Sequence, residues 1–197
     1  MGAFNKVTKE SIDNIQINAG VILNDFNPEN PVKPTATSII TATTGGIQAR
    51  CIPTFEDFGA DIDNCPNNTM EMKKITGYDC TLTFTALDIN SATIKLGLGA
   101  ATEFSKEIKA RELNNADFAD IWFVSERVDG KIIAILLKNG LSTGGFDYKT
   151  QKNGKGQMTI TITGHVSIDD ADEVPMEFYI CDNVKSGTSA LTVDYDE

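Results

Sequence analysis

The chain of 197 residues contains a single histidine, His165, and this limits its acid–base chemistry. A catalytic arrangement of a nucleophile with a histidine, such as Ser-His-Asp or Cys-His, would have to use this residue. His165 lies near Thr163, on the predicted polar face of a strand, where a structural or exposed role is the simpler interpretation. We therefore expect no catalytic residue and no enzymatic activity.

Two short motifs resemble parts of ligand-binding loops. Gly154-Lys155-Gly156 suggests a phosphate loop, but the first glycine and the Ser or Thr after the lysine are missing, and no helix follows. Asp61-x-Asp63-Asn64 resembles a fragment of a calcium loop without its glycine and terminal glutamate. We expect a hairpin turn at the first motif and solvated acids at the second.

Metal ions find few ligands in the sequence. An acidic cluster, Asp169-Asp170-Ala171-Asp172-Glu173, leaves a weak cation site open as an alternative to solvated acids. No two cysteines are spaced as CxxC, and His165 is not close to any of them in sequence, so a zinc site is not expected. Cys80 and Cys181 lie on predicted apolar strand faces, and a cytoplasm keeps such thiols reduced. We expect no metal and no cofactor.

Charge and hydropathy bear on the partners of the chain. A net charge of -11 disfavours tight binding to nucleic acid, because phosphate contacts need Lys and Arg, and also disfavours an anionic membrane surface. No apolar stretch approaches the roughly 20 residues of a membrane span, and residues 1–10 lack the apolar core of a signal peptide. We expect no membrane association, and synthesis and assembly in a cytoplasm.

The clearest pattern is an alternation with a period of two, which is typical of a strand with one buried face and one wet face. It occurs over residues 78–86 and again over residues 157–163. The apolar positions are Tyr78, Cys80, Leu82, Phe84, Ala86, Met158, Ile160 and Ile162. The outward positions are Asp79, Thr81, Thr83, Thr85, Thr159, Thr161 and Thr163. They predict a smooth polar surface that is uncharged or acidic, which fits either an ordinary solvated sheet or the lining of a wide pore.

Other strands are predicted over residues 35–43, 47–52, 118–125, 131–137, 146–151, 157–168 and 174–181. Asp129-Gly130 and Asn153-Gly154-Lys155-Gly156 predict hairpin turns. The run 132–137 is apolar on both faces and should be covered on both, and Trp122 fits a core better than a ligand platform. Residues 88–101 form the best helix candidate. The chain is therefore predicted to be mainly β, an antiparallel β-sandwich or barrel with one flanking α-helix.

The length suggests one domain with extended termini. Proline and asparagine near residue 30 predict an N-terminal arm over 1–34, followed by the β-sandwich domain over 35–181 and an acidic C-terminal arm over 182–197. Residues 53–75 predict a long loop between strands, and loops of this length are usually functional or disordered. Phe55, Phe58 and Ile62 argue against full disorder, because they need something to pack on.

Several segments, in their order, resemble the major tail (tail tube) proteins of siphophages that infect Gram-positive bacteria. They are Thr43-Thr44-Gly45-Gly46, Ile62-Asp63-Asn64-Cys65-Pro66, Gly77-Tyr78-Asp79-Cys80-Thr81-Leu82, Phe118-Ala119-Asp120-Ile121-Trp122-Phe123, Leu137-Lys138-Asn139-Gly140-Leu141-Ser142-Thr143-Gly144-Gly145-Phe146, Gly154-Lys155-Gly156-Gln157, Thr163-Gly164-His165 and Asp172-Glu173-Val174-Pro175-Met176-Glu177. No single segment is specific, but together they cover residues from about 15 to 181, and the residues after 181 lie outside the resemblance.

The resemblance implies a structural protein of the virion tail, whose hexameric rings stack into a tube for the delivery of DNA, which passes without specific binding. Tape measure, tail terminator and distal tail proteins are then expected partners. The candidate lumen-facing residues are Asp79, Thr81, Thr83, Thr85, Thr159, Thr161 and Thr163. The long loop is the candidate contact between rings, through Phe55, Asp57, Phe58, Asp61 and Asp63.

Three alternatives remain open at this point. The inner tube of a contractile tail or tailocin is a close relative of the first hypothesis, and a sheath partner would separate the two. A binding module, such as a capsid decoration or carbohydrate-binding sandwich, would present a patch of exposed aromatic residues, for which Trp122 and Tyr148 are among the few candidates. An enzyme is remote, because no catalytic constellation is present.

Overall fold

The computed structural model describes residues 7–182 and 184, and the described chain is mainly β. Its strands are β1 (Val21–Leu23), β2 (Ile39–Thr41), β3 (Thr43–Asp57), β4 (Lys73–Ala86), β5 (Ala101–Phe104), β6 (Glu107–Ala110), β7 (Ala119–Glu126), β8 (Ile132–Ser142), β9 (Asp147–Lys149), β10 (Gln157–Thr163) and β11 (Met176–Cys181). Its helices are α1 (Lys9–Asp13) and α2 (Ser91–Leu98), with single 3-10 turns η1 (Met70–Met72), η2 (Asn115–Asp117) and η3 (Ile168–Asp170).

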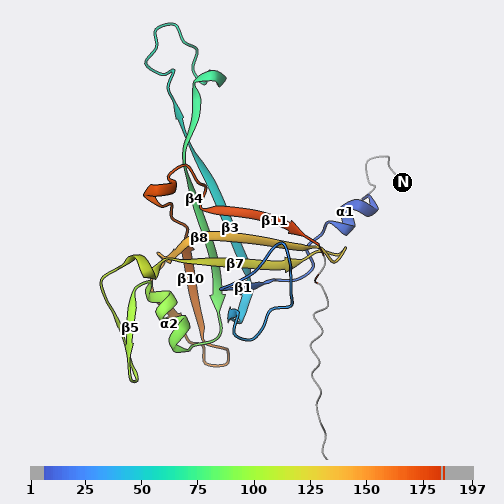
Figure 1. The fold of residues 1–197 in the computed structure, drawn as a ribbon, viewed down its shortest axis with the longest axis vertical. Helices are drawn as coiled ribbons and strands as arrows, with labels where there is room; N and C mark the ends of the chain where they lie inside the picture. The colour runs from blue at the N-terminus through green and yellow to red at the C-terminus, as the bar shows by residue number, and fades with distance from the viewer. Residues whose placement is uncertain (1–6, 183, 185–197) are drawn as a thin grey trace, which may run out of the picture.

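The strands form two packed layers. One layer, called here the apolar sheet, consists of β2, β1, β7, β8 and β11, and the other, called the threonine sheet, consists of β9, β10, β4 and β3. The strands of the apolar sheet run across those of the threonine sheet (Figure 1), and the two are joined where the end of β8 pairs with β10. Within the described residues, the series of paired strands ends at β2 and at β3, which do not pair with each other. The two layers are therefore an open sandwich of crossing sheets.

All strand pairs that the structure describes are antiparallel, which confirms the predicted fold class. The hairpin turns predicted at Asp129-Gly130 and near Gly154 connect β7 to β8 and β9 to β10. The turn at Gly130 has a φ of 81°, a conformation that costs glycine little. Gly45 and Gly46 lie in a β-bulge inside β3, because the register with β4 shifts between Thr44 and Ile47.

The alternation in β4 and β10 builds the core between the two layers. Leu82 lies opposite Ile162 and Phe84 lies opposite Ile160, and all four side chains are at most 2% exposed. From the apolar sheet, Ile121, Phe123, Ile135 and Leu137 complete this cluster. Burying side chains of this size stabilises the fold by roughly 1.5–3 kcal/mol each.

The central strands β7 and β8 of the apolar sheet are buried on both faces, as predicted for residues 132–137. The second face carries a separate cluster, in which Trp122, Ala134 and Leu136 pack together with Leu23. Phe26 covers Trp122 with ring centroids 5.5 Å apart, and Tyr179 of β11 lies at the same distance on another side. Trp122 is therefore a core residue, which confirms the sequence-based interpretation.

Helix α2 is the flanking helix that the sequence predicts, but it is shorter than residues 88–101. It starts at Ser91 because Asn90 caps it: the Asn90 side chain accepts a hydrogen bond from the Thr93 amide at 3.0 Å, and the Thr93 hydroxyl accepts one from the Asn90 amide. Gly97 faces the core beside Met158, where a Cβ would lie at an ordinary contact distance of 3.4 Å from the sulfur.

Two of the strand pairings were not predicted. Strand β1 lies within the segment expected to be an N-terminal arm, yet it pairs with β7, and Ile22 and Leu23 are at most 1% exposed. The hairpin of β5 and β6 follows α2 as a separate two-stranded sheet. The predicted acidic arm from residue 182 lies outside the described residues, except for Asp182 and Val184.

The long loop predicted over residues 53–75 is wrong in its bounds. Strand β3 continues to Asp57 and β4 starts at Lys73, so that only residues 58–72 connect them. Pro53 is compatible with this extension because β3 is an edge strand, where one side needs no amide donor. The two strands project together beyond the sandwich (Figure 1), and residues 53–77 are called here the hairpin arm.

Candidate functional site

The predicted lumen-facing threonines lie side by side on one face of the threonine sheet. Thr85 lies opposite Thr159, Thr83 opposite Thr161, and Thr81 opposite Thr163. Directly opposed residues in an antiparallel pair project to the same face. Because the alternating neighbours fill the core, this face points away from the apolar sheet, and its side chains are partly or fully exposed. The structure therefore brings the predicted residues together as one continuous row of pairs.

Hydroxyl groups link the pairs across the strands. The Thr83 and Thr161 hydroxyl oxygens are 3.2 Å apart, and Thr163 lies 2.7 Å from the hydroxyl of Thr143, which follows β8. Asp79 continues the row on β4 and lies opposite Ile52 of β3. The two contacts pair four hydroxyl groups with one another, and the three threonine pairs carry no formal charge.

The edges of the threonine sheet add residues that the sequence analysis missed. On β3, Gln48 lies opposite Thr83 and Arg50 opposite Thr81. On β9, Asp147 and Lys149 lie opposite Thr159 and Gln157 of β10. The face is therefore a threonine strip flanked by both acids and bases, which corrects the expectation of an uncharged or acidic surface. The apolar neighbours of Arg50, Ala49 and Cys51, are a sequence signal for its outward orientation, and both are half-buried in the structure.

The hairpin arm carries the residues predicted to contact a neighbouring ring. Phe55, Phe58 and Ile62 are 54%, 47% and 48% exposed, and the arm also exposes Met70 and Ile75. Lys73 and Lys74 each lie over one of the phenylalanine rings, at 5.7 Å from Phe55 and 5.4 Å from Phe58. These apolar side chains therefore have few packing partners among the described residues.

Asp57 orders the tip of the arm. One of its carboxylate oxygens accepts a hydrogen bond from the Gly59 amide at 3.0 Å, and the other accepts one from the Asn68 amide at 3.2 Å. The Phe58 amide donates to the Met72 carbonyl at 3.0 Å, which closes the loop at its base. Asp57 is therefore a structural residue of the arm, whereas Asp61 and Asp63 are exposed.

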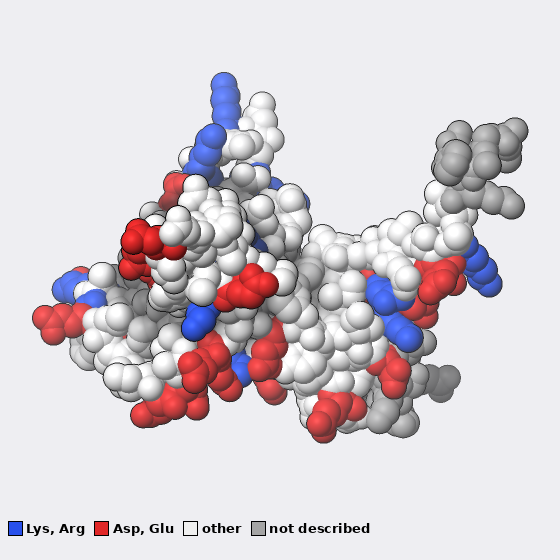
Figure 2. Space-filling model, turned by 90° about the horizontal axis from the view of Figure 1, so that it is seen from above, with Lys and Arg blue, Asp and Glu red and all other residues white. Residues whose placement is uncertain are grey.

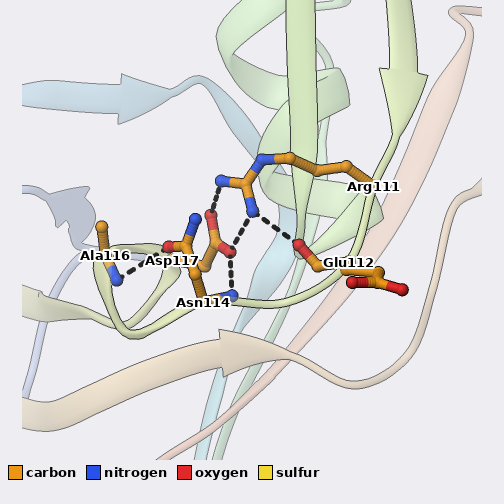
Figure 3. A network of polar contacts seen from close by, with 5 residues as sticks. All are labelled: Arg111, Glu112, Asn114, Ala116 and Asp117. Atoms are coloured by element: carbon orange, nitrogen blue, oxygen red, sulfur yellow. Dashed lines mark hydrogen bonds and ion pairs between the residues drawn. The ribbon is translucent and has the colours of Figure 1, made fainter.

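A second polar network holds the connection between β6 and β7 (Figure 3). The Arg111 guanidinium donates to both carboxylate oxygens of Asp117, and also to the Glu112 carbonyl at 2.7 Å. The Asn114 amide donates to Asp117 at 2.9 Å. Hydrogen bonds from Arg111 are the main reason why the pKa of Asp117 lies below its usual range. The network fixes the course of the chain as it enters the central strand β7.

Lys138 of β8 forms an ion pair with one member of the acidic cluster at residues 169–173, Glu173. Its ammonium group lies 2.8 Å from a Glu173 oxygen and 2.7 Å from a Glu177 oxygen, and this contact joins β8 to the chain that enters β11. The bond from Lys138 lowers the pKa of Glu177. In residues 7–182 and 184, no three His, Cys, Asp or Glu side chains gather closely enough to hold a metal ion. Among these residues, the structure therefore shows no set of ligands for the weak cation site that the sequence left open.

His165 is held in a structural setting. Its Nδ1 donates to the Asn139 carbonyl at 3.1 Å, and the Asn139 side-chain amide donates back to the His165 carbonyl at 3.1 Å. The ring of Phe118 meets the imidazole edge-on, with centroids 5.2 Å apart. This setting fits the structural role that the sequence suggested.

Figure 2 views the end of the molecule from which the hairpin arm projects. Acidic side chains are spread over this end, with wide uncharged areas between them and smaller groups of basic side chains. None of the described helices is long and apolar enough to span a bilayer.

No protein-family model matches the chain, and no curated protein matches its sequence. Among solved structures, the chain is similar to one from the "Virion of native gene transfer agent (GTA) particle", with 7% identity, a TM-score of 0.42, and coverage of 83% of this chain and 96% of that one. It is also similar to a chain from the "Tail of empty GTA particle computed with helical refinement, C6 symmetry", with 8% identity, a TM-score of 0.40, and coverage of 76% and 92%.

Proposed function

We propose that the protein is the subunit of a siphophage tail tube, in which hexameric rings stack around a channel for the delivery of DNA. The observation that carries this proposal is the pairing of two features on one chain. One is a four-stranded sheet whose exposed face is centred on threonines. The other is an arm, continuous with that sheet, whose apolar side chains are about half exposed.

The threonine sheet has a composition suited to the wall of a bore. Threonine favours strands and carries no charge, so a wall of threonines gives passing phosphates no fixed anchor. Arg50 and Lys149 are accompanied by Asp79 and Asp147 on the same face, and the four charges sum to zero. DNA moving along such a wall meets little net attraction or repulsion.

The edges of the threonine sheet are suited to ring closure. Strands β3 and β9 each pair on one side only within the described residues, and an open edge favours pairing with another chain. Four strands from each of six subunits give a barrel of about 24 strands. At about 4.8 Å per strand and roughly 40° of tilt, its backbone diameter is about 45–50 Å. A DNA duplex of roughly 20 Å passes with room for side chains.

The hairpin arm supplies a contact between rings. A row of half-exposed apolar side chains on a projecting hairpin becomes stable when a neighbouring subunit covers it. Asp57 keeps the tip in one conformation, so that little ordering is required on contact. Tape measure, tail terminator and distal tail proteins are the further partners that this role requires, and the virion tail is its location.

Native mass spectrometry and negative-stain microscopy test the proposal directly. The purified full chain is examined over rising concentration, together with a Phe58→Ser variant. We expect rings with a central hole, in species of six subunits or its multiples, and short tubes at high concentration. The variant is expected to form rings that do not stack. Stable monomers at every concentration, or compact oligomers without a hole, would contradict the proposal.

A further inference from the structure

Two thiols are in direct contact just outside the hairpin arm, where its strands enter the sandwich. Cys51 of β3 lies opposite Cys80 of β4, and the Cys80 thiol donates to the Cys51 sulfur at 2.9 Å. Directly opposed residues in an antiparallel pair have Cα atoms about 4.5–5.5 Å apart. A disulfide needs a Cα separation of about 4.4–6.8 Å, so the backbone can accept this bond without moving.

The other two cysteines are placed differently. Cys65 lies near the tip of the arm, where its sulfur is 3.4 Å from the Thr69 hydroxyl. Cys181 is buried at the end of β11, in the cluster on the far face of the apolar sheet. All four thiols are free in this structure. Only Cys51 and Cys80 therefore form a pair among these residues.

We propose that Cys51 and Cys80 are a redox site, which closes to a disulfide when the protein meets a peroxide. Cys51 is partly exposed and Cys80 is fully buried, so the peroxide reaches Cys51 first. The Cys51 thiolate attacks one peroxide oxygen, the O–O bond breaks, and Cys51 becomes a sulfenic acid while the other oxygen leaves as water after protonation. The Cys80 sulfur then loses its proton, attacks the Cys51 sulfur, and displaces the hydroxyl group as a second water. Two thiols are oxidised, and one hydrogen peroxide is reduced to two waters.

The environment of Cys80 makes the second step dependent on pH. Burial, and then the contact with Cys51, raise the pKa of Cys80 to about 12. The thiolate is the attacking species, so closure is expected to be slow at neutral pH and to accelerate as the pH rises.

The bond would join the two strands at the point where the arm leaves the sandwich. The cysteines are 29 positions apart in sequence, and the segment between them includes the whole hairpin arm. A crosslink there prevents the two strands from separating, and it stabilises the arm by limiting the unfolded chain. This inference concerns the chemistry of the subunit and does not depend on tube assembly.

Peptide mapping of the full chain tests the site. The protein is treated with a small excess of hydrogen peroxide, free thiols are blocked with N-ethylmaleimide, and tryptic peptides are read with and without reduction. Trypsin places Cys51 and Cys65 in the same peptide, because cleavage follows Arg50 and Lys73. The mapping is therefore done on wild type and on Cys65→Ser, and repeated from pH 7 to pH 9.

We expect the peptide of Cys51 to be joined to that of Cys80 in both proteins, with at least a several-fold faster closure at the higher pH. In a Cys51→Ser variant this crosslink is expected to be absent, while Cys181 stays available to the blocking reagent after unfolding. The proposal is overturned if Cys51 proceeds to sulfinic acid while Cys80 remains free. It is also overturned if neither thiol reacts, or if the crosslink persists in Cys51→Ser.

Discussion

Thr83 of β4 and Thr161 of β10 face each other across the threonine sheet, with their hydroxyl oxygens 3.2 Å apart. They lie in the middle of three consecutive threonine pairs that share one face. The residues that alternate with the threonines along each strand, such as Leu82 and Ile160, are fully buried. One alternation thus builds the core on one side and a polar wall on the other.

Replacing both central threonines by lysine, Thr83→Lys with Thr161→Lys, should leave the subunit folded and block the passage of DNA. Both side chains project away from the core, so the cost in stability is small, whereas lysines offer anchors to phosphates. We expect tails to assemble and DNA release to slow at least tenfold, with the defect eased by added salt. The rate of DNA release from complete particles measures this effect.

The matched control is Thr83→Ser with Thr161→Ser, which keeps the hydroxyl groups and adds no charge. It should release DNA at the rate of the unmodified protein. If the lysine pair also releases DNA at that rate, the threonine face does not line the channel.

Phe55→Ser with Phe58→Ser should abolish stacking with little effect on the isolated subunit. Both rings are about half exposed, and their main described partners are single lysines, so each change should cost no more than about 1 kcal/mol. The loss of stacking is followed by sedimentation and microscopy, and the stability of the monomer by thermal unfolding.

Phe104→Ser is a suitable control for the arm, because Phe104 of β5 is 84% exposed and lies outside the arm. It should leave stacking intact. Equal loss of assembly in both variants would mean that general surface hydrophobicity, rather than the hairpin arm, drives association.

Phe84→Ala should destabilise the subunit by about 3–5 kcal/mol, because a large side chain that is 2% exposed is removed from the centre of the core. Thr85→Ala, the next position on the same strand, should cost less than about 1 kcal/mol. Urea unfolding of the two variants measures the contrast. Similar costs at the two positions would contradict the assignment of inner and outer faces.

Asp117→Asn should remove a part of the stability that depends on pH. Hydrogen bonds from Arg111 hold the folded pKa of Asp117 below its unfolded value near 4, so the carboxylate stabilises the fold above that value. This stabilisation is lost as the pH falls through the folded pKa. The difference in unfolding free energy between wild type and variant should therefore be constant above about pH 5 and shrink in acid. A difference that grows in acid would contradict the ion pair of Figure 3.

The strands with a strict period of two could be predicted from the sequence, and others could not. In β4 and β10 the alternation shows which side chains share a face, and both strands are found over the alternating residues. Their bounds differ, because β4 starts at Lys73 and β10 ends at Thr163 rather than at residue 168. Strand β1 has only three residues, too few for an alternation to be recognised, and its place in the core depends on pairing with β7. Register between distant strands is a tertiary property that local patterns do not contain.

The same limit applies to the candidate site. The threonine rows could be predicted because each lies on one strand, but their direct pairing, and the neighbours Arg50 and Lys149, depend on the register of β3 and β9. The sequence predicts a loop over residues 53–75 because Pro53, Gly59 and Pro66 break regular patterns and acidic residues outnumber basic ones there. Strand β3 is an edge strand, where proline and charged residues are tolerated.

A cryo-electron microscopy reconstruction of the assembled protein tests the central claim most directly. We expect a ring with a central bore, whose wall carries Thr81, Thr83, Thr161 and Thr163, and hairpin arms that reach the adjacent ring. An assembly whose bore is lined by another face, or one that has no bore, would contradict the account.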